Sequence, residues 1–139
     1  MKEINNYNIG NSDYSKHKFQ IWDIIVYYRL NFFEGNMLKY LLRKKNDKQE
    51  DYKKIRHYIE KSYEILKINS SFLNHKLRIR SGDEQNIMIY DILLDYNNLS
   101  NFETQILNLI LNFYYIQTHK EYNNNLNEIL RYINLLIKE

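Results

Sequence analysis

Apolar residues recur three and four positions apart along most of the chain, which is the spacing of one face of an α-helix. The clearest case is the stretch 124–138, whose apolar residues are Leu126, Ile129, Leu130, Ile133, Leu136 and Ile137. The same periodicity predicts helices over residues 19–30, 32–45, 48–68, 83–96 and 100–119, and the stretch 72–80 fits either a short helix or an extended segment. The pattern therefore predicts about six helices, and it reveals no internal repeat and no sustained heptad.

Three positions are typical of helix starts, because a polar residue is followed three residues later by glutamate. In such a capping box each side chain accepts a hydrogen bond from the backbone N–H of the other residue. The candidates are Asn31 with Glu34, Asp47 with Glu50 and Ser100 with Glu103, each ahead of a stretch with helical periodicity. Residues 81–83, Ser-Gly-Asp, are the clearest break between two helical halves.

The composition excludes several other kinds of protein. The 139 residues include three glycines, no proline and no cysteine, so tight β-hairpin turns, disulfides and zinc fingers are not expected. No apolar run approaches the roughly 20 residues of a membrane span, and the N-terminus has no apolar signal region. We therefore expect one all-α domain over residues 1–139, a compact bundle with a polar arm (1–16), a hairpin region (17–68) and a helical C-terminal half (69–139), and no membrane partner.

Positive charge is concentrated in one segment. The net charge of the chain is +3, whereas residues 39–57 alone hold eight lysines and arginines (positions 39, 43, 44, 45, 48, 53, 54 and 56) against three acids (positions 47, 50 and 51). The rest of the chain is therefore slightly acidic. We do not expect a nucleic-acid duplex as a partner, since duplex-binding domains usually carry a larger excess of positive charge.

Four polar residues share one side of the predicted second helix, opposite its apolar side: Asn36, Lys39, Tyr40 and Arg43. Lysine supplies a compact positive charge and arginine a planar fork, and both suit phosphate oxygens. Asparagine and tyrosine add neutral hydrogen bonds. This side of the helix is therefore a candidate site for a phosphate group or a nucleotide.

The third predicted helix carries a matching set, because Asp51, Lys54 and Tyr58 share one of its faces. The short link between the two helices predicts an antiparallel hairpin whose polar faces border a common cleft. We expect Asp51 to orient Arg43 or Lys39, or to act as a base towards a hydroxyl. The alternative is a solvated surface, on which a pair such as Asp51 with Arg43 contributes less than about 1 kcal/mol.

Residues 11–66 also resemble a family of small bacteriophage proteins catalogued as a domain of unknown function. The matching positions are Tyr14, His17, Phe32, Gly35, Asn36, Lys39, Tyr40, Arg43, Glu50, Asp51, Lys54 and Tyr58. This family includes the nucleotide kinase of short-tailed coliphages, which lacks a Walker loop. The resemblance implies nucleotide binding and, for one branch, phosphoryl transfer to deoxynucleoside monophosphates. Residues 69–139 lie outside it.

We interpret the chain as a phage nucleotide-binding protein of the host bacterial cytoplasm that sequesters a nucleotide, for instance a host-defence signal. Its expected ligand-binding residues are Asn36, Lys39, Tyr40, Arg43, Lys54 and Tyr58. The first alternative is a nucleoside monophosphate kinase that uses ATP and Mg²⁺, with Asp51 and His17 as catalytic residues. The second is a helical interaction protein that blocks a host factor. No protein-held metal site is expected, since the histidines lack metal-ligand spacing. A second copy of the chain is a further candidate partner, in a homo-oligomer.

Overall fold

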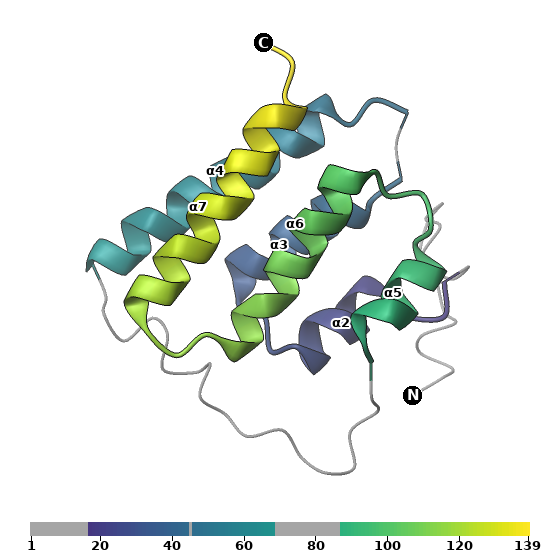
Figure 1. The fold of residues 1–139 in the computed structure, drawn as a ribbon, viewed down its shortest axis with the longest axis horizontal. Coiled ribbons are helices and arrows are strands. Elements are labelled where there is room, and N and C mark those ends of the chain that lie inside the picture. Colours follow the sequence, from purple (N-terminus) through teal and green to yellow (C-terminus); the bar gives the residue numbers. More distant parts are fainter. Residues whose placement is uncertain (1–16, 45, 69–86) are drawn as a thin grey trace.

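The computed structural model describes residues 17–44, 46–68 and 87–139 (Figure 1). Within these ranges every secondary-structure element is a helix, which confirms the predicted all-α class. The elements are α2 (Ile21–Tyr27), α3 (Phe32–Leu42), α4 (Gln49–Ile68), α5 (Ile89–Asp95), α6 (Asn101–Asn112), the 3₁₀ turn η3 (Phe113–Tyr115) and α7 (His119–Leu136). No described helix is both long enough and apolar enough to cross a membrane.

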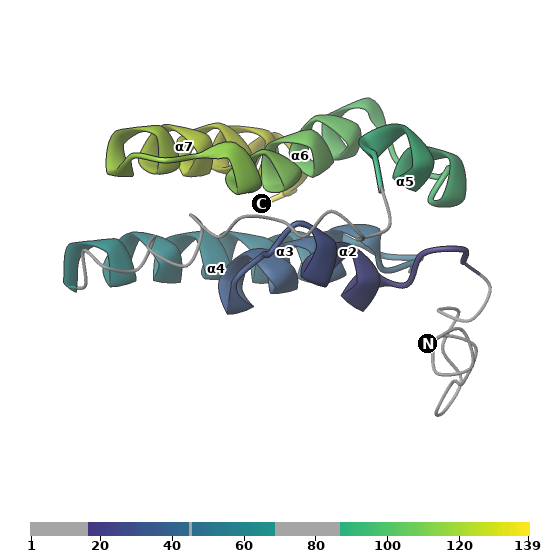
Figure 2. The ribbon, with the colours of Figure 1, turned by 90° about the horizontal axis from the view of Figure 1, so that it is seen from below.

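The helices form two layers, with α2, α3 and α4 in one and α5, α6 and α7 in the other (Figure 2). Within each layer neighbouring helices pack together, and between the layers α3 packs on α6 and α4 on α7. The core lies between the layers, where Leu38, Ile55, Ile110 and Ile129 are completely buried. Each layer therefore covers the apolar face of the other.

The joint between α3 and α4 differs from the predicted one, because α3 ends at Leu42 rather than at Lys45. The Nζ of Lys48 donates hydrogen bonds to the carbonyl oxygens of Tyr40, Leu41 and Arg43, at 2.8, 3.1 and 2.6 Å. A lysine in this place satisfies carbonyls that lack partners inside the helix and complements the negative end of the helix dipole. The end of α3 is thus set by a side chain from the start of α4.

The predicted capping boxes at Asn31 and Ser100 are confirmed, with both reciprocal hydrogen bonds present in each. The third differs, because Asp47 accepts a hydrogen bond from the backbone N–H of Gln49 at 3.0 Å. The N-terminal helix is also shorter than predicted, and beyond α2 Arg29 takes a left-handed backbone angle, with φ 54°. Such an angle is incompatible with a continuing α-helix.

The C-terminal half departs from the predicted boundaries as well. The helix expected over 100–119 ends at Asn112, and the 3₁₀ turn that follows carries the buried ring of Phe113. The last helix begins at His119, earlier than expected, because the Thr118 side chain caps it. The ambiguous stretch 72–80 and the expected break at Gly82 lie outside the described residues.

Two buried glutamates join the layers through tyrosines. Glu34, at the start of α3, accepts a hydrogen bond from the Tyr122 hydroxyl of α7 at 2.5 Å. Glu103, at the start of α6, accepts one from the Tyr52 hydroxyl of α4 at 3.1 Å. Burial, together with the negative charge of Glu34, raises the pKa of Tyr122 above its usual value of 10.0, and burial and Glu103 raise the pKa of Tyr52.

We expect the stability of the protein to fall once the pH exceeds about 10. Because both pKa values are raised in the folded state, only the unfolded chain ionises these two tyrosines there. The stabilisation is complete below the unfolded pKa and is lost as the pH rises towards the folded values.

Urea unfolding at about pH 9 and about pH 11 measures this loss, since the two conditions bracket the ordinary tyrosine pKa. The double variant Tyr52→Phe/Tyr122→Phe should lose less free energy of unfolding between the two conditions than the wild type. The control is Tyr90→Phe/Tyr115→Phe, which alters two exposed tyrosines and should leave the pH dependence unchanged. Equal losses in the wild type and the first variant would contradict the assignment.

Candidate functional site

The ring of Tyr40 lies at the centre of the predicted polar face. It stacks on Tyr58 of α4, with ring centroids 6.1 Å apart and an interplanar angle of 17°. Three cationic groups lie over the Tyr40 ring: Lys54 Nζ at 4.9 Å, Lys39 Nζ at 5.6 Å and Arg43 Cζ at 5.9 Å from its centroid. The structure therefore brings together five of the predicted residues, which we call the basic stripe (Lys39, Tyr40, Arg43, Lys54 and Tyr58).

The helix pair explains why these side chains meet. The start of α4 touches the end of α3 through Lys48, while Phe33, near the start of α3, contacts Tyr58 further along α4. The two helices therefore run in opposite directions and pack closely. The α3 residues of the stripe stand at i, i+1 and i+4 and therefore lie on one side of α3. They face the α4 residues of the stripe, which stand at i and i+4 on the neighbouring side of α4.

A shallow hollow of about 400 Å³ adjoins the stripe on α4. It is lined by Tyr40, Glu50, Lys53, Lys54, His57 and Tyr58. Lys39 and Lys54 are exposed and Arg43 is half-buried. Among the described residues, no carboxylate lies within ion-pairing distance of these three cations. Closely spaced cations without a protein counter-charge attract an anion from solution.

Asn36 lies outside the hollow, as do Lys39 and Arg43. Its Nδ2 donates a hydrogen bond to the Phe32 carbonyl oxygen at 2.7 Å, one turn back in α3. It lines a separate small pocket with Ile25, Gly35 and Lys39. Gly35 lets α2 approach there, because an added Cβ would lie 3.2 Å from the Ile25 side chain.

Asp51 lies beneath the surface rather than on the stripe. Its side chain is fully buried, and the cation beside it is Lys48, with Nζ 3.7 Å from Oδ2, rather than Arg43 or Lys39 as expected. Neither carboxylate oxygen accepts a hydrogen bond within the described part of the chain. The cause is the packing of α4, whose buried face includes Asp51 together with Ile55 and Ile59.

Lys48 is the residue at this joint that the sequence pattern did not single out. It bridges buried Asp51 and the last carbonyl groups of α3. Arg43 is the first residue of the link that follows α3. Burial lowers the pKa of Lys48 below its usual 10.5, although Asp51 and Glu103 oppose this shift. The sequence feature that could have indicated this ion pair is the spacing of three residues between Lys48 and Asp51 at the start of a helix.

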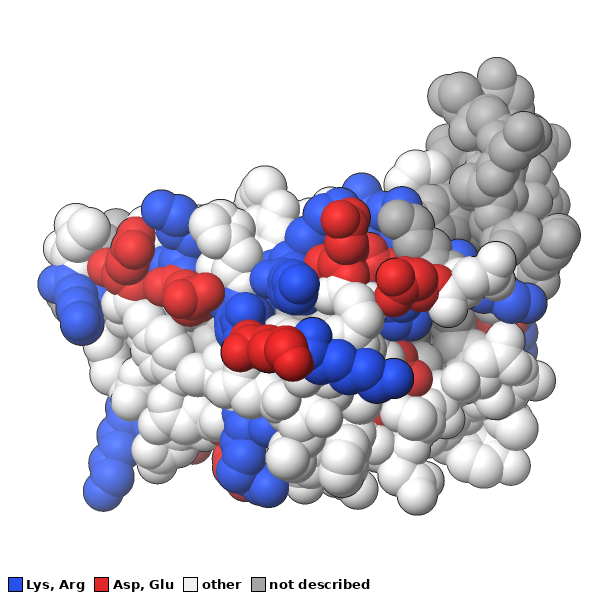
Figure 3. Space-filling model, turned by 90° about the horizontal axis from the view of Figure 1, so that it is seen from above, with Lys and Arg blue, Asp and Glu red and all other residues white. Residues whose placement is uncertain are grey.

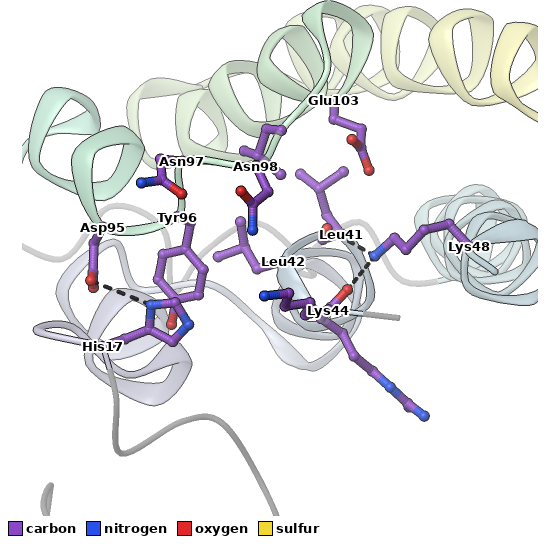
Figure 4. Close-up of a pocket in the computed structure, with 12 residues that line it drawn as sticks. His17, Leu41, Leu42, Lys44, Lys48, Asp95, Tyr96, Asn97, Asn98 and Glu103 are labelled. Carbon is purple, nitrogen blue, oxygen red and sulfur yellow. Dashed lines mark hydrogen bonds and ion pairs between the residues drawn. The ribbon is translucent and has the colours of Figure 1, made fainter. Parts of the chain in front are cut away.

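His17 lies at a second cavity, on the other side of the end of α3 (Figure 4). Its ring stacks on Tyr96 with centroids 3.9 Å apart, and its Nδ1 lies 3.3 Å from Asp95 Oδ1. This cavity, of about 310 Å³, is also lined by Lys44, Lys48 and Glu103. His17 is thus separated from Tyr40 and Tyr58, and of the stripe only Arg43 reaches its cavity.

The carboxylate of Asp95 anchors this part of the chain. Besides His17, it accepts hydrogen bonds from the backbone N–H groups of Lys18 and Phe19, at 3.1 and 2.9 Å. Asp91, on the same helix, accepts one from the backbone N–H of Met88 at 3.0 Å. Asp91 therefore caps the start of α5, and Asp95 holds the segment that leads into α2.

Charge on one face of the molecule is mixed. On the face in Figure 3, basic and acidic side chains are interspersed rather than gathered into one extended basic area. Comparisons with protein-family models, with curated proteins and with solved structures find no match to this chain. The functional conclusion therefore depends on the residues of the stripe and their geometry.

Proposed function

We propose that this protein binds a nucleotide by its phosphate groups at the basic stripe and releases it unchanged. The observation that carries the proposal is the convergence of Lys39, Arg43 and Lys54 on one aromatic ring, within 6 Å of its centroid in each case. Charge-assisted hydrogen bonds from such groups are the strong contacts in phosphate recognition.

The surroundings of the stripe favour a nucleotide over a simple phosphate ion. A nucleotide combines a polyanion with a planar base, and bases stack on aromatic and histidine side chains. The hollow next to the cations has His57 and Tyr58 in its wall. In the proposed complex the phosphates contact the three cations, and the nucleoside lies in the hollow.

Capture without turnover is favoured by the position of Asp51. The candidate base is fully buried against Lys48 and has no exposed surface towards the stripe. A general base must come within hydrogen-bonding reach of the proton it removes. Sequestration of a nucleotide signal of host defence is the biological use that the bacteriophage resemblance suggests.

We expect calorimetric titration to detect binding of nucleotides, with an affinity that rises from monophosphate to triphosphate and weakens as salt is added. The unphosphorylated nucleoside is the control for the phosphates, and inorganic triphosphate is the control for the base. Chromatography of the ligand after incubation with ATP and Mg²⁺ tests turnover. Lack of binding to every nucleotide would refute the proposal, and a phosphorylated product would establish the kinase alternative instead.

A further inference from the structure

The two layers repeat each other helix by helix. Helices α2, α3 and α4 have 7, 11 and 20 residues, and α5, α6 and α7 have 7, 12 and 18. Both middle helices begin with a capping box that ends in a buried glutamate, Glu34 in one layer and Glu103 in the other. The order of the helices within each layer is also the same (Figure 2).

The sequences of the layers match once the helices are paired. Residues 21–28 read Ile-Trp-Asp-Ile-Ile-Val-Tyr-Tyr, and residues 89–96 read Ile-Tyr-Asp-Ile-Leu-Leu-Asp-Tyr. Residues 30–34 read Leu-Asn-Phe-Phe-Glu, and residues 99–103 read Leu-Ser-Asn-Phe-Glu. Buried positions match too: Leu38 corresponds to Leu107 and Ile59 to Ile129, and all four are completely buried. Hydrophobic periodicity alone did not reveal this repeat, because every amphipathic helix shares that periodicity.

Hydrogen bonds between the layers are exchanged reciprocally. The Tyr28 hydroxyl donates to the Ile87 carbonyl oxygen at 2.8 Å, and the Tyr96 hydroxyl donates to the Phe19 carbonyl oxygen at 2.8 Å. In the pairing above, Tyr28 corresponds to Tyr96 and Phe19 to Ile87.

The buried glutamates follow the same rule. Tyr52, the fourth residue of α4, binds Glu103, and Tyr122, the fourth residue of α7, binds Glu34. When residue i of one unit contacts residue j of the other, and j contacts i in return, the two units are related as in a twofold dimer.

We infer that the chain consists of two copies of one three-helix unit, folded against each other as a dimer within a single chain, and that only the first copy carries the anion-binding face. The positions that correspond to Lys39, Arg43 and Lys54 are Asn108, Asn112 and Asn124, which are all exposed. Leu109 and Glu128 correspond to Tyr40 and Tyr58. The second copy therefore presents the same helical scaffold without its cations and stacked rings.

The ligand part of this inference rests on the proposed function and predicts one nucleotide per chain. It also predicts that the site can be moved to the second copy. The transplant is Asn108→Lys, Leu109→Tyr, Asn112→Arg, Asn124→Lys and Glu128→Tyr, and it should raise the calorimetric stoichiometry for ATP from one to two. Combined with Lys39→Asn, Arg43→Asn and Lys54→Asn, the transplant should restore a single site.

The control for the combined protein is the chain that carries the three asparagine substitutions alone, which should bind no ATP. Circular dichroism confirms that each variant is folded. A folded transplant that still binds one ATP per chain would overturn the equivalence of the two faces.

A second arm tests the duplication without any nucleotide. Tyr28→Phe and Tyr96→Phe should lower the melting temperature by similar amounts, because they remove equivalent hydrogen bonds. Tyr52→Phe and Tyr122→Phe should both lower it, with the larger effect at Tyr122, whose hydroxyl also accepts a hydrogen bond from Asn31 Nδ2 at 3.5 Å. Tyr90→Phe, at an exposed position, is the control and should leave the melting temperature unchanged. If one member of each pair lowered it and the other did not, the twofold relation would be wrong. A wild type that binds no nucleotide would refute the proposed function, and this arm would still decide the duplication.

Discussion

Replacing Lys39, Arg43 and Lys54 together with asparagine is expected to lower nucleotide affinity by about three orders of magnitude or more. A hydrogen bond to a charged group contributes about 1.5–3 kcal/mol, and each factor of ten in affinity corresponds to about 1.4 kcal/mol. The fold should persist, because Lys39 and Lys54 are exposed, Arg43 is half-buried and none of the three has an acidic partner among the described residues. Asparagine is a suitable replacement, since it stands at all three corresponding positions of the second unit.

The matched control removes the same amount of charge elsewhere. Lys67, Lys120 and Lys138 are exposed and lie outside the stripe and its hollow, so their replacement with asparagine also lowers the net charge by three. This control should bind nucleotide with an affinity close to that of the wild type in calorimetry at moderate salt. If both triple variants lost affinity equally, binding would depend on overall charge and not on the stripe.

Lys48→Met is expected to destabilise the protein by about 3–5 kcal/mol, because it leaves Asp51 as a buried charge without a counter-charge. The substitution also removes the donor for three carbonyl oxygens at the end of α3. Urea denaturation measures the change in the free energy of unfolding. Lys53→Met, which alters an exposed lysine in the first turns of α4, is the control and should change stability by less than about 0.5 kcal/mol.

A double-mutant cycle isolates the contribution of the ion pair. The double variant Lys48→Met/Asp51→Leu removes both charges, so no buried charge is left without a partner. It should therefore be more stable than the sum of the two single effects predicts. If the two effects simply added, Lys48 would act only as a cap on α3. The result also bears on binding, because Lys48 holds the joint from which Arg43 reaches the stripe.

Local patterns in the sequence were sufficient to predict the helical class, the starts of α3 and α6, and a set of six candidate ligand-binding residues, of which the structure brings five together in the stripe. These features depend on interactions within a few residues: helical periodicity places Lys39, Tyr40 and Arg43 on one side, and a capping box satisfies the N–H groups of its own helix. The short link between α3 and α4 then brings Lys54 and Tyr58 to the same surface.

Only the tertiary structure decided the place of Asp51, the place of His17 and the end of α3. Asp51 and Lys54 point within about 60° of each other on the α4 wheel, so packing against the neighbouring helices determines which of them is buried. His17 pairs with Asp95 and stacks on Tyr96, and these residues are brought near it only by folding. The matching stretches of the two units can be found in the sequence alone. Their twofold relation rests on the reciprocal hydrogen bonds of Tyr28 with Ile87 and of Tyr96 with Phe19, which form only when the two layers meet.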